Sequence, residues 1–376
     1  MKTRTRRRTS RSSAIAGLLA ALATAAAVAG CGSSGTTSGS SGSGSAGSGG
    51  GSSTTGTTAA VANIPFSGPE SGLPTSYPDP TPRPGFSYTV GYLSPNASIG
   101  FLASVYQGVK AETARLGGRF IGYDAQFNQD RQVSQFSDLL AQHPDVIVAY
   151  PLLPSALTAQ VRQAESEGIP VVTNDSPADA SEPLLPGYAT NVHQGLDLSR
   201  YSIARALARD APGATYALLG VSLPVPSLRY AMVRSHYWND RFGLKYQGEV
   251  DSSDDTSAGA QQAMTTLLAR YPNVQVVVAY NDTAAEAASA VARSSGKSNI
   301  KIAGDGGDAT AVRMIRNGQL WGTYGPDEAG IGRQQAIAAY DLASRQHLPL
   351  PRNIVMTTGT MVTRANADSY TPANGE

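Results

Sequence analysis

The sequence predicts an α/β protein built from two similar lobes, each with a mainly parallel β-sheet covered by helices. Short apolar runs of strand length alternate with longer amphipathic segments, which is the rhythm of β-α-β units. This rhythm begins near residue 86, pauses after residue 173 and restarts near residue 214, which indicates two units of related build. The chain that follows residue 86 is also long enough for two lobes. The single cysteine, Cys31, precedes all of these segments, so a buried core must stabilise the folded part without disulfides.

Periodicity defines the elements of the first half. In the segment 99–116, Leu102, Val105 and Val109 fall roughly on one helix face, and a Gly-Gly pair follows as a stop signal. The apolar runs DVIVAY and IPVVT have the composition of buried strands. The predicted order is a strand at 86–93, a helix at 99–116, a strand at 119–123, a helix at 131–142, a strand at 145–150, a helix at 155–167 and a strand at 169–173.

The second half repeats the pattern. ATYALLGV and VQVVVAY are further buried strands, each followed by a segment of helical periodicity. Ligands of open parallel sheets bind beyond the carboxyl ends of the strands, so the loops that follow strands are the candidate site. The predicted strands lie at 214–221, 245–250, 274–280 and 300–303, and the predicted helices at 227–240, 258–270, 283–293 and 309–316.

The N-terminus has the features of a secretory signal peptide. Residues 1–13 carry six basic side chains and no acidic one, and residues 14–30 are almost entirely small or apolar. This apolar stretch is shorter than the roughly 20 residues that span a bilayer. The triplet at 6–8 is Arg-Arg-Arg, but the apolar pair usual after a twin-arginine signal is missing, so the export route stays open.

Cys31 ends this segment in a distinctive context. Val28-Ala29-Gly30-Cys31 resembles the lipobox of bacterial lipoproteins, with Val28 in place of the usual Leu. That resemblance implies that Cys31 receives lipid and anchors the chain to the outer face of the cell membrane. The alternative is an ordinary signal peptide with an unrelated cysteine.

Two low-complexity stretches follow Cys31. Residues 32–60 are nearly all Gly, Ser, Thr and Ala, which cannot bury enough apolar surface to fold. Residues 64–84 contain seven prolines and are expected to form a stiffer, extended spacer. We therefore expect a signal peptide at 1–30 and a lipidated, disordered tether at 31–85.

The charge balance argues against a nucleic-acid partner. The chain has 29 basic and 28 acidic side chains, but residues 1–30 hold six of the basic ones and none of the acidic ones. The remainder carries 23 against 28, a formal net charge of −5. A nucleic-acid surface would need a clustered basic face.

From residue 86 to about residue 363 the sequence resembles the type I periplasmic binding proteins, in particular their ribose-binding-like sugar branch. Four segments carry the resemblance in order: TVGYLSPNASIGFLASVYQGVKAETARLGG, PDVIVAYPLLPSALTAQVRQAESEGIPVVTNDSP, YPNVQVVVAYNDTAAEAASAV and KIAGDGGDATAVRMIRNGQLWGTYG. The resemblance implies two Rossmann-like lobes joined by a three-strand hinge, with crossings near Asn191, Pro326 and Thr357. The implied boundaries are 86–190 with 327–356 for the first lobe, 191–326 with 357–368 for the second, and a tail at 369–376.

The resemblance also implies a set of ligand-binding residues in the first lobe. A sugar has C–H faces that suit aromatic rings and hydroxyl edges that suit bidentate polar groups. Phe101 falls where the family places a stacking aromatic, although a core residue on a helix face is the alternative. Asn96 is either a hydroxyl contact or a helix cap, and Asp175 either the family's ligand Asp or a turn residue. Ser176 stands where sugar binders often have Arg.

In the second lobe the resemblance places a ligand Arg near Arg229, with Arg234 as its competitor and a surface ion pair as the alternative. Asn281 is expected to cap a helix and face the ligand, with Asp282 as local support. Asp305 is displaced by one position, because the family's ligand Asp falls on Gly306. Asp308 is the other candidate for that role, and Pro326 falls where the hinge often has Gln. The six predicted ligand-binding residues are Asn96, Phe101, Asp175, Arg229, Asn281 and Asp305, with Tyr150, Tyr280 and Tyr324 as further stacking surfaces.

These observations predict a solute-binding lipoprotein and not an enzyme. The sequence has no Gly-x-Ser-x-Gly, His-Glu-x-x-His or Walker motif, and its four histidines are scattered, so we expect no cofactor and no metal. We expect a monomer that closes about its hinge on a sugar-like solute and delivers it to the permease of an ABC transporter. A nucleoside, a polyol or a signalling molecule stays open as the solute. A lipoprotein that presents its closed form to a receptor kinase is the alternative function.

Overall fold

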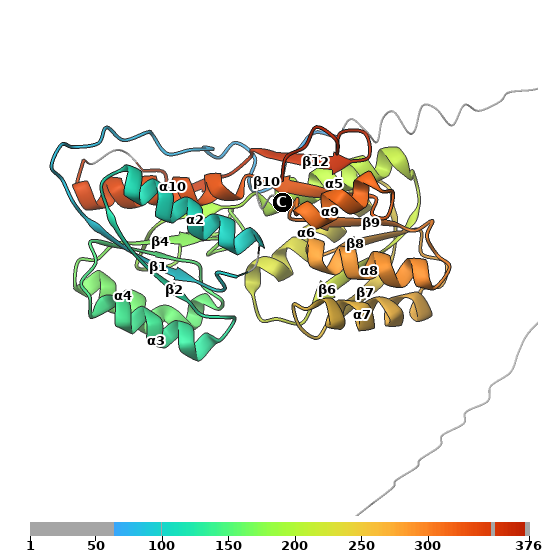
Figure 1. Cartoon of the computed structure of the whole chain (residues 1–376), viewed down its shortest axis with the longest axis horizontal. Helices are drawn as coiled ribbons and strands as arrows, with labels where there is room; N and C mark the ends of the chain where they lie inside the picture. Colours follow the sequence, from blue (N-terminus) through green and yellow to red (C-terminus); the bar gives the residue numbers. More distant parts are fainter. Residues whose placement is uncertain (1–63, 99, 347–349, 373–376) are drawn as a thin grey trace, which may run out of the picture. The chain divides into compact units, whose positions relative to one another are not determined.

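The computed structural model describes residues 64–98, 100–346 and 350–372 (Figure 1). The predicted signal peptide, Cys31 and the Gly/Ser-rich stretch lie outside the described residues. Among the described residues, no helix is long and apolar enough to cross a membrane.

The first sheet has six strands in the order β11-β5-β4-β3-β1-β2, and every neighbouring pair is parallel. Together with its helices we call it the first lobe. Its strands are β1 (Thr89–Ser94), β2 (Arg119–Asp124), β3 (Val146–Ala149), β4 (Val171–Asn174), β5 (Tyr188–His193) and β11 (Asn353–Val355), and its helices are α2 (Gly100–Arg115), α3 (Gln129–Leu140), the 3-10 turn η1 (Pro154–Leu157), α4 (Thr158–Ser166) and α10 (Glu328–Ser344).

The second sheet also has six strands, in the order β12-β10-β9-β8-β6-β7, and only β10 and β12 are antiparallel. With its helices it forms the second lobe. Its strands are β6 (Thr215–Val221), β7 (Lys245–Ser252), β8 (Val276–Ala279), β9 (Lys301–Asp305), β10 (Gly322–Pro326) and β12 (Gly359–Thr363), and its helices are α5 (Leu196–Asp210), α6 (Pro226–Arg241), α7 (Ser257–Arg270), α8 (Asp282–Ser294) and α9 (Ala309–Arg316).

This architecture confirms the predicted α/β fold of two lobes with mainly parallel sheets. The central strands VIVA of β3 and VVVA of β8 are completely buried, because helices cover both faces of each sheet. The chain passes between the sheets after β5, after β10 and between β11 and β12 (Figure 1). The first passage lies slightly later than the boundary expected near Asn191, since β5 pairs within the first sheet as far as His193.

The proline-rich segment does not form the separate spacer that its composition predicts. Residues 64–86, which we call the strap, pack on the folded lobes. On the second lobe, the ring of Phe66 lies 5.3 Å from that of Tyr201, and the Glu70 carboxylate accepts hydrogen bonds from the backbone N–H groups of Asp197 (3.1 Å) and Leu198 (3.0 Å). Glu70 therefore binds the first turn of α5, where unpaired N–H groups need acceptors.

The rest of the strap binds the first lobe. Tyr77 is only 2 % exposed, and its backbone N–H donates to Gln334 Oε1 of α10 at 2.7 Å. Its hydroxyl lies 2.6 Å from the hydroxyl of Thr190 in β5. The backbone N–H of Arg83 donates to the Tyr340 hydroxyl at 2.8 Å. The strap thus contacts both lobes, because its few large side chains bind residues of each lobe. The amino-acid composition of the segment does not reveal these contacts.

Candidate ligand-binding site

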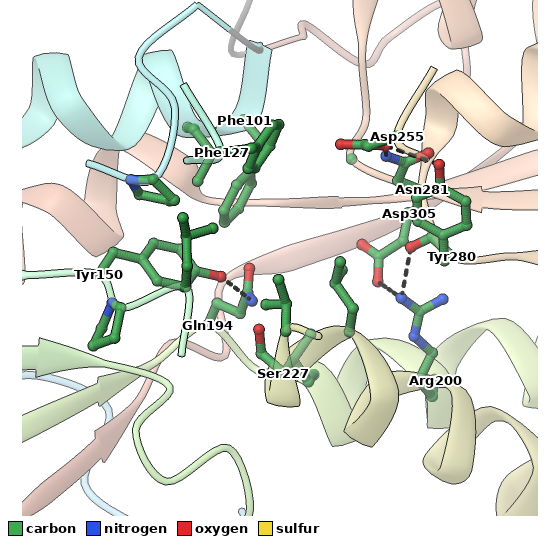
Figure 2. A pocket seen from close by; sticks show the side chains of 18 residues that line it. Phe101, Phe127, Tyr150, Gln194, Arg200, Ser227, Asp255, Tyr280, Asn281 and Asp305 are labelled. Atoms are coloured by element: carbon green, nitrogen blue, oxygen red, sulfur yellow. Dashed lines mark hydrogen bonds and ion pairs between the residues drawn. The ribbon is translucent and has the colours of Figure 1, made fainter. Parts of the chain in front are cut away.

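A cavity of about 130 Å³ lies where the loops after the strands of both sheets converge (Figure 2). Its lining comes from the loops that follow β1, β2, β3, β5, β6, β7, β8 and β9, and from the first turns of α2, α5 and α6. This is the position at which open parallel sheets bind ligands, because the strands end there and the loops are free to carry specificity.

The first lobe contributes mostly hydrocarbon to the cavity. We call this side the apolar wall; it consists of Pro95, Phe101, Leu102, Phe127, Tyr150, Pro151 and Leu152. Phe127 has the left-handed φ of 56°, and its backbone N–H donates to the Pro95 carbonyl at 2.8 Å. This turn directs the Phe127 ring toward the cavity beside Phe101 (Figure 2).

Tyr150 carries the one polar group of the apolar wall, and that group is already engaged. Gln194 Nε2, from the loop between β5 and α5, donates to the Tyr150 hydroxyl at 3.2 Å. Burial is the main reason that the pKa of Tyr150 lies above its usual value, so the phenol stays neutral.

The second lobe contributes three aliphatic side chains and all of the charges in the lining; these charged groups and their partners form what we call the polar wall. Arg200 of α5 is only 2 % exposed, and its Nη2 lies 3.0 Å from Asp305 Oδ2 at the end of β9. The same guanidinium donates to the backbone carbonyls of Ala279 (3.3 Å) and Tyr280 (3.1 Å), and the Ser199 hydroxyl donates to Asp305 at 2.8 Å. Burial raises the pKa of Asp305 and lowers that of Arg200, while the attraction between the two charges opposes both shifts.

Asp255 is the second carboxylate of the polar wall. Its Oδ1 accepts hydrogen bonds from the Tyr280 hydroxyl at 2.8 Å and from Asn281 Nδ2 at 2.9 Å. Asn281 Oδ1 in turn accepts from the backbone N–H of Ala284 and caps α8. Both polar ends of the Asn281 amide thus have protein partners, and Asp255 is the member of this group with an oxygen left for a ligand.

Three of the six predicted ligand-binding residues line the cavity, namely Phe101, Asn281 and Asp305. Of the proposed stacking residues, Tyr150 and Tyr280 also line it. The structure places the other three predicted residues differently.

Asn96, Asp175 and Arg229 are not among the lining residues. Asn96 Oδ1 accepts from the backbone N–H of Ser98 within its own loop. Arg229 makes an exposed ion pair with Glu249 on the outer side of α6. Its competitor, Arg234, bonds to the buried carboxylate of Asp197.

Asp175 lies directly behind the cavity. It is 3 % exposed, and it accepts from the backbone N–H of Gln194 at 3.0 Å and from Asn174 Nδ2 at 2.6 Å. Burial raises its pKa to about 7 despite these donors. Asp175 therefore positions the Gln194 loop, which joins the two walls.

The sequence reasoning did not find Gln194, Arg200, Phe127 or Ser227, all of which line the cavity. Arg200 is the most informative omission, since its position within α5 offers no motif. The only signal available was its place just after the first passage between the lobes, where a helix begins at the edge of the site.

Comparison with known proteins agrees with this geometry. The chain belongs to the periplasmic binding protein domain family, whose sequence profile matches residues 90–347. Its relatives place it with the type I, ribose-binding branch of that family. The ribose import binding protein RbsB of Bacillus subtilis (strain 168) is 28% identical over 256 residues, which cover 68% of this chain and 81% of that protein. The D-apiose import binding protein of Paraburkholderia graminis is 25% identical over 217 residues, which cover 55% of this chain and 68% of that protein.

Solved structures share the fold. An ABC transporter solute-binding protein from Mycobacterium smegmatis with bound glycerol superposes with a TM-score of 0.66 at 23% identity, covering 76% of this chain and 96% of the other. One from Burkholderia graminis in complex with D-arabinose has a TM-score of 0.67 at 19% identity, covering 76% and 98%. The chain is thus a solute-binding protein of the kind that serves ABC importers, a family that works outside the cytoplasm and is not enzymatic.

Proposed function

We propose that this protein captures a sugar or sugar-like polar solute for an ABC importer and delivers it to the membrane permease. The observation that supports this most strongly is the cavity itself, since aromatic rings line one side and hydrogen-bonding carboxylates the other. The relatives named above support the same solute class through their own ligands, ribose and D-apiose.

Hinge closure is the proposed mechanism. The solute would contact residues of both lobes, and the chain passes between the lobes three times. A solute shifts the population toward the closed form by as much as it binds that form more tightly. The strap contacts both lobes and would move with them.

Lipid attachment at Cys31 is a further part of this proposal. It would keep the domain near its permease and raise the local concentration without new contacts. Metabolic labelling with an alkyne fatty acid tests it directly. The wild-type chain should be labelled and Cys31→Ser should not; an unlabelled wild-type chain contradicts the anchor.

A thermal-shift screen of the purified full-length protein tests the binding function. The panel should contain pentoses, hexoses, polyols, nucleosides and amino acids. A true solute at 100 times its Kd adds ~2.7 kcal/mol to the free energy of unfolding. A panel in which no sugar or polyol raises the melting temperature contradicts the proposal, and a response to amino acids alone would move it to another solute class.

A further inference from the structure

The polar groups of the cavity are distributed very unequally between its two walls. On the apolar wall, the lining side chains are hydrocarbon except for Tyr150, whose hydroxyl is bonded to Gln194. A ligand hydroxyl that faced Phe101, Phe127 or Leu152 would lose its water without gaining a partner. Such a loss disfavours binding, whereas a methyl or methylene group in the same place is favoured.

The polar wall offers acceptors to a ligand. Asp255 engages Tyr280 and Asn281 through Oδ1, and Asp305 engages Arg200 and Ser199 through Oδ2. The other oxygen of each carboxylate has no hydrogen-bond partner among the described residues. The Nε of Arg200 is buried and also has no hydrogen-bond partner there. A ligand that donates hydrogen bonds, as hydroxyl groups do, fits this wall.

The charges that line the cavity do not cancel. Two carboxylates, Asp255 and Asp305, stand against the single guanidinium of Arg200, and no other charged side chain is in the lining. The immediate partners of Asp255 are the neutral donors Tyr280 and Asn281. The site therefore carries one net negative charge in partly desolvated surroundings, where repulsion of an anion is strong.

From this asymmetry we infer that the ligand is a small neutral solute with hydroxyl groups along one edge and a deoxy or methyl group along the other. A deoxysugar is the simplest member of this class. The inference rests on the proposed function and narrows it: sugars that are hydroxylated all round bind less well, and sugar acids and sugar phosphates are rejected.

Isothermal titration of the full-length protein with sugars matched except at C6 tests the inference. Each series compares a methyl, a hydroxymethyl and a carboxylate group on the same ring: D-fucose, D-galactose and D-galacturonate, with the gluco, manno and L-galacto series alongside, and D-ribose as a further comparison. In the series that binds best, we expect the methyl sugar to bind about tenfold more tightly than the hydroxymethyl sugar. The carboxylate sugar should show no detectable binding.

Two outcomes separate this inference from the proposed function. If ribose or a hydroxymethyl sugar binds as tightly as the best methyl sugar, or if an acid binds best, the inference is wrong while sugar binding stands. If none of these sugars binds, the inference is overturned, and the thermal-shift panel of other sugars and polyols decides whether the proposed function stands.

Variants of each wall add a second, independent test. Phe127→Tyr and Leu152→Asn place a polar group on the apolar wall, and each should reduce the preference for methyl over hydroxymethyl at least threefold. Asp255→Asn removes the net charge and should raise the affinity for the carboxylate sugar relative to the neutral one about tenfold. Val233→Ser, on an exposed part of α6 away from the cavity, is the matched control and should change neither ratio. Unchanged ratios in all three wall variants, with melting temperatures near that of the wild type, overturn the inference.

Discussion

The two walls of the cavity differ in chemistry, although the lobes that carry them share one architecture. Both lobes present loops from the carboxyl ends of a six-stranded sheet. The first lobe fills those loops with Pro, Leu and aromatic residues, and the second adds an ion pair, a second carboxylate and an amide to its own three aliphatic side chains. The fold therefore determines where the ligand lies, while the loop side chains of each lobe determine which part of the ligand that lobe contacts.

The largest effect on the free energy of unfolding is expected from the ion pair that supports the polar wall. Arg200→Met leaves the largely buried carboxylate of Asp305 without its counter-charge, which costs up to about 3–5 kcal/mol of the free energy of unfolding. Chemical denaturation measures this loss, and binding should be lost with it. The double variant Arg200→Met/Asp305→Asn removes both charges and should recover much of the stability. If the free energy of unfolding of Arg200→Met is within about 1 kcal/mol of the wild-type value, the ion pair does not support the wall.

A smaller effect is expected behind the loop that joins the walls. The pKa of Asp175 is raised to about 7 by burial, so the folded state favours its protonated form. For an acid with a raised pKa, stability is highest at low pH and falls as the pH rises toward the folded pKa. We expect Asp175 to lower the free energy of unfolding by about 2–3 kcal/mol between pH 5 and pH 8.

The slope of stability against pH measures this contribution. Asp175→Asn should flatten the slope, and Asp138→Asn, on an exposed part of α3, should leave it unchanged. The burial of His193 lowers its pKa to about 4, so this neighbour is neutral throughout the range. Equal slopes for the wild type and Asp175→Asn would contradict the assignment. Burial also raises the pKa of Glu70 to about 8, and this group adds the same pH dependence to the wild type and to Asp175→Asn.

Loss of the cap of α8 is expected to lower the free energy of unfolding by about 1 kcal/mol. Asn281→Ala removes the bond from Asn281 to the Ala284 N–H and the bond that orients Asp255. Because the Asn281 amide is satisfied within the protein, affinity should fall less than tenfold, through the looser Asp255. Titration of the variant with the identified solute checks this. A loss of a hundredfold or more would mean that Asn281 contacts the ligand directly.

The smallest effect is expected outside both walls. Arg229→Ala breaks an exposed ion pair with Glu249, and such pairs contribute about 0–1 kcal/mol. Affinity should change less than twofold. A large loss of affinity would mean that the polar wall extends to this part of α6, which would revise the comparison of the two walls.

The scaffold could be predicted from the sequence where burial leaves a simple pattern. Strands such as β3 and β8 are buried on both faces, so each is a continuous apolar run. Helices α5 and α10 were not predicted from periodicity, because they bury polar and charged side chains, including Arg200 and Gln335, that interrupt an apolar stripe. The strap was taken for a spacer because seven prolines outweighed the few anchoring side chains, such as Tyr77, on which its packing depends.

The site could be predicted only in part for a related reason. Phe101, Asn281 and Asp305 follow or adjoin recognisable strands, so their position at the edge of the sheets could be read from the order of the elements. Arg200 lies within a helix, and its role depends on a long side chain that reaches the end of β9. Periodicity carries no information about such a contact.

A crystal structure with the tightest-binding solute of the C6 series tests the central claim most directly. The solute should lie inside the cavity, with its methyl edge against Phe101 and Phe127 and its hydroxyl groups within hydrogen-bonding distance of Asp255 and Asp305. A solute bound outside this cavity, or one whose hydroxyl groups face Phe127 while its apolar edge faces Asp255, would contradict it.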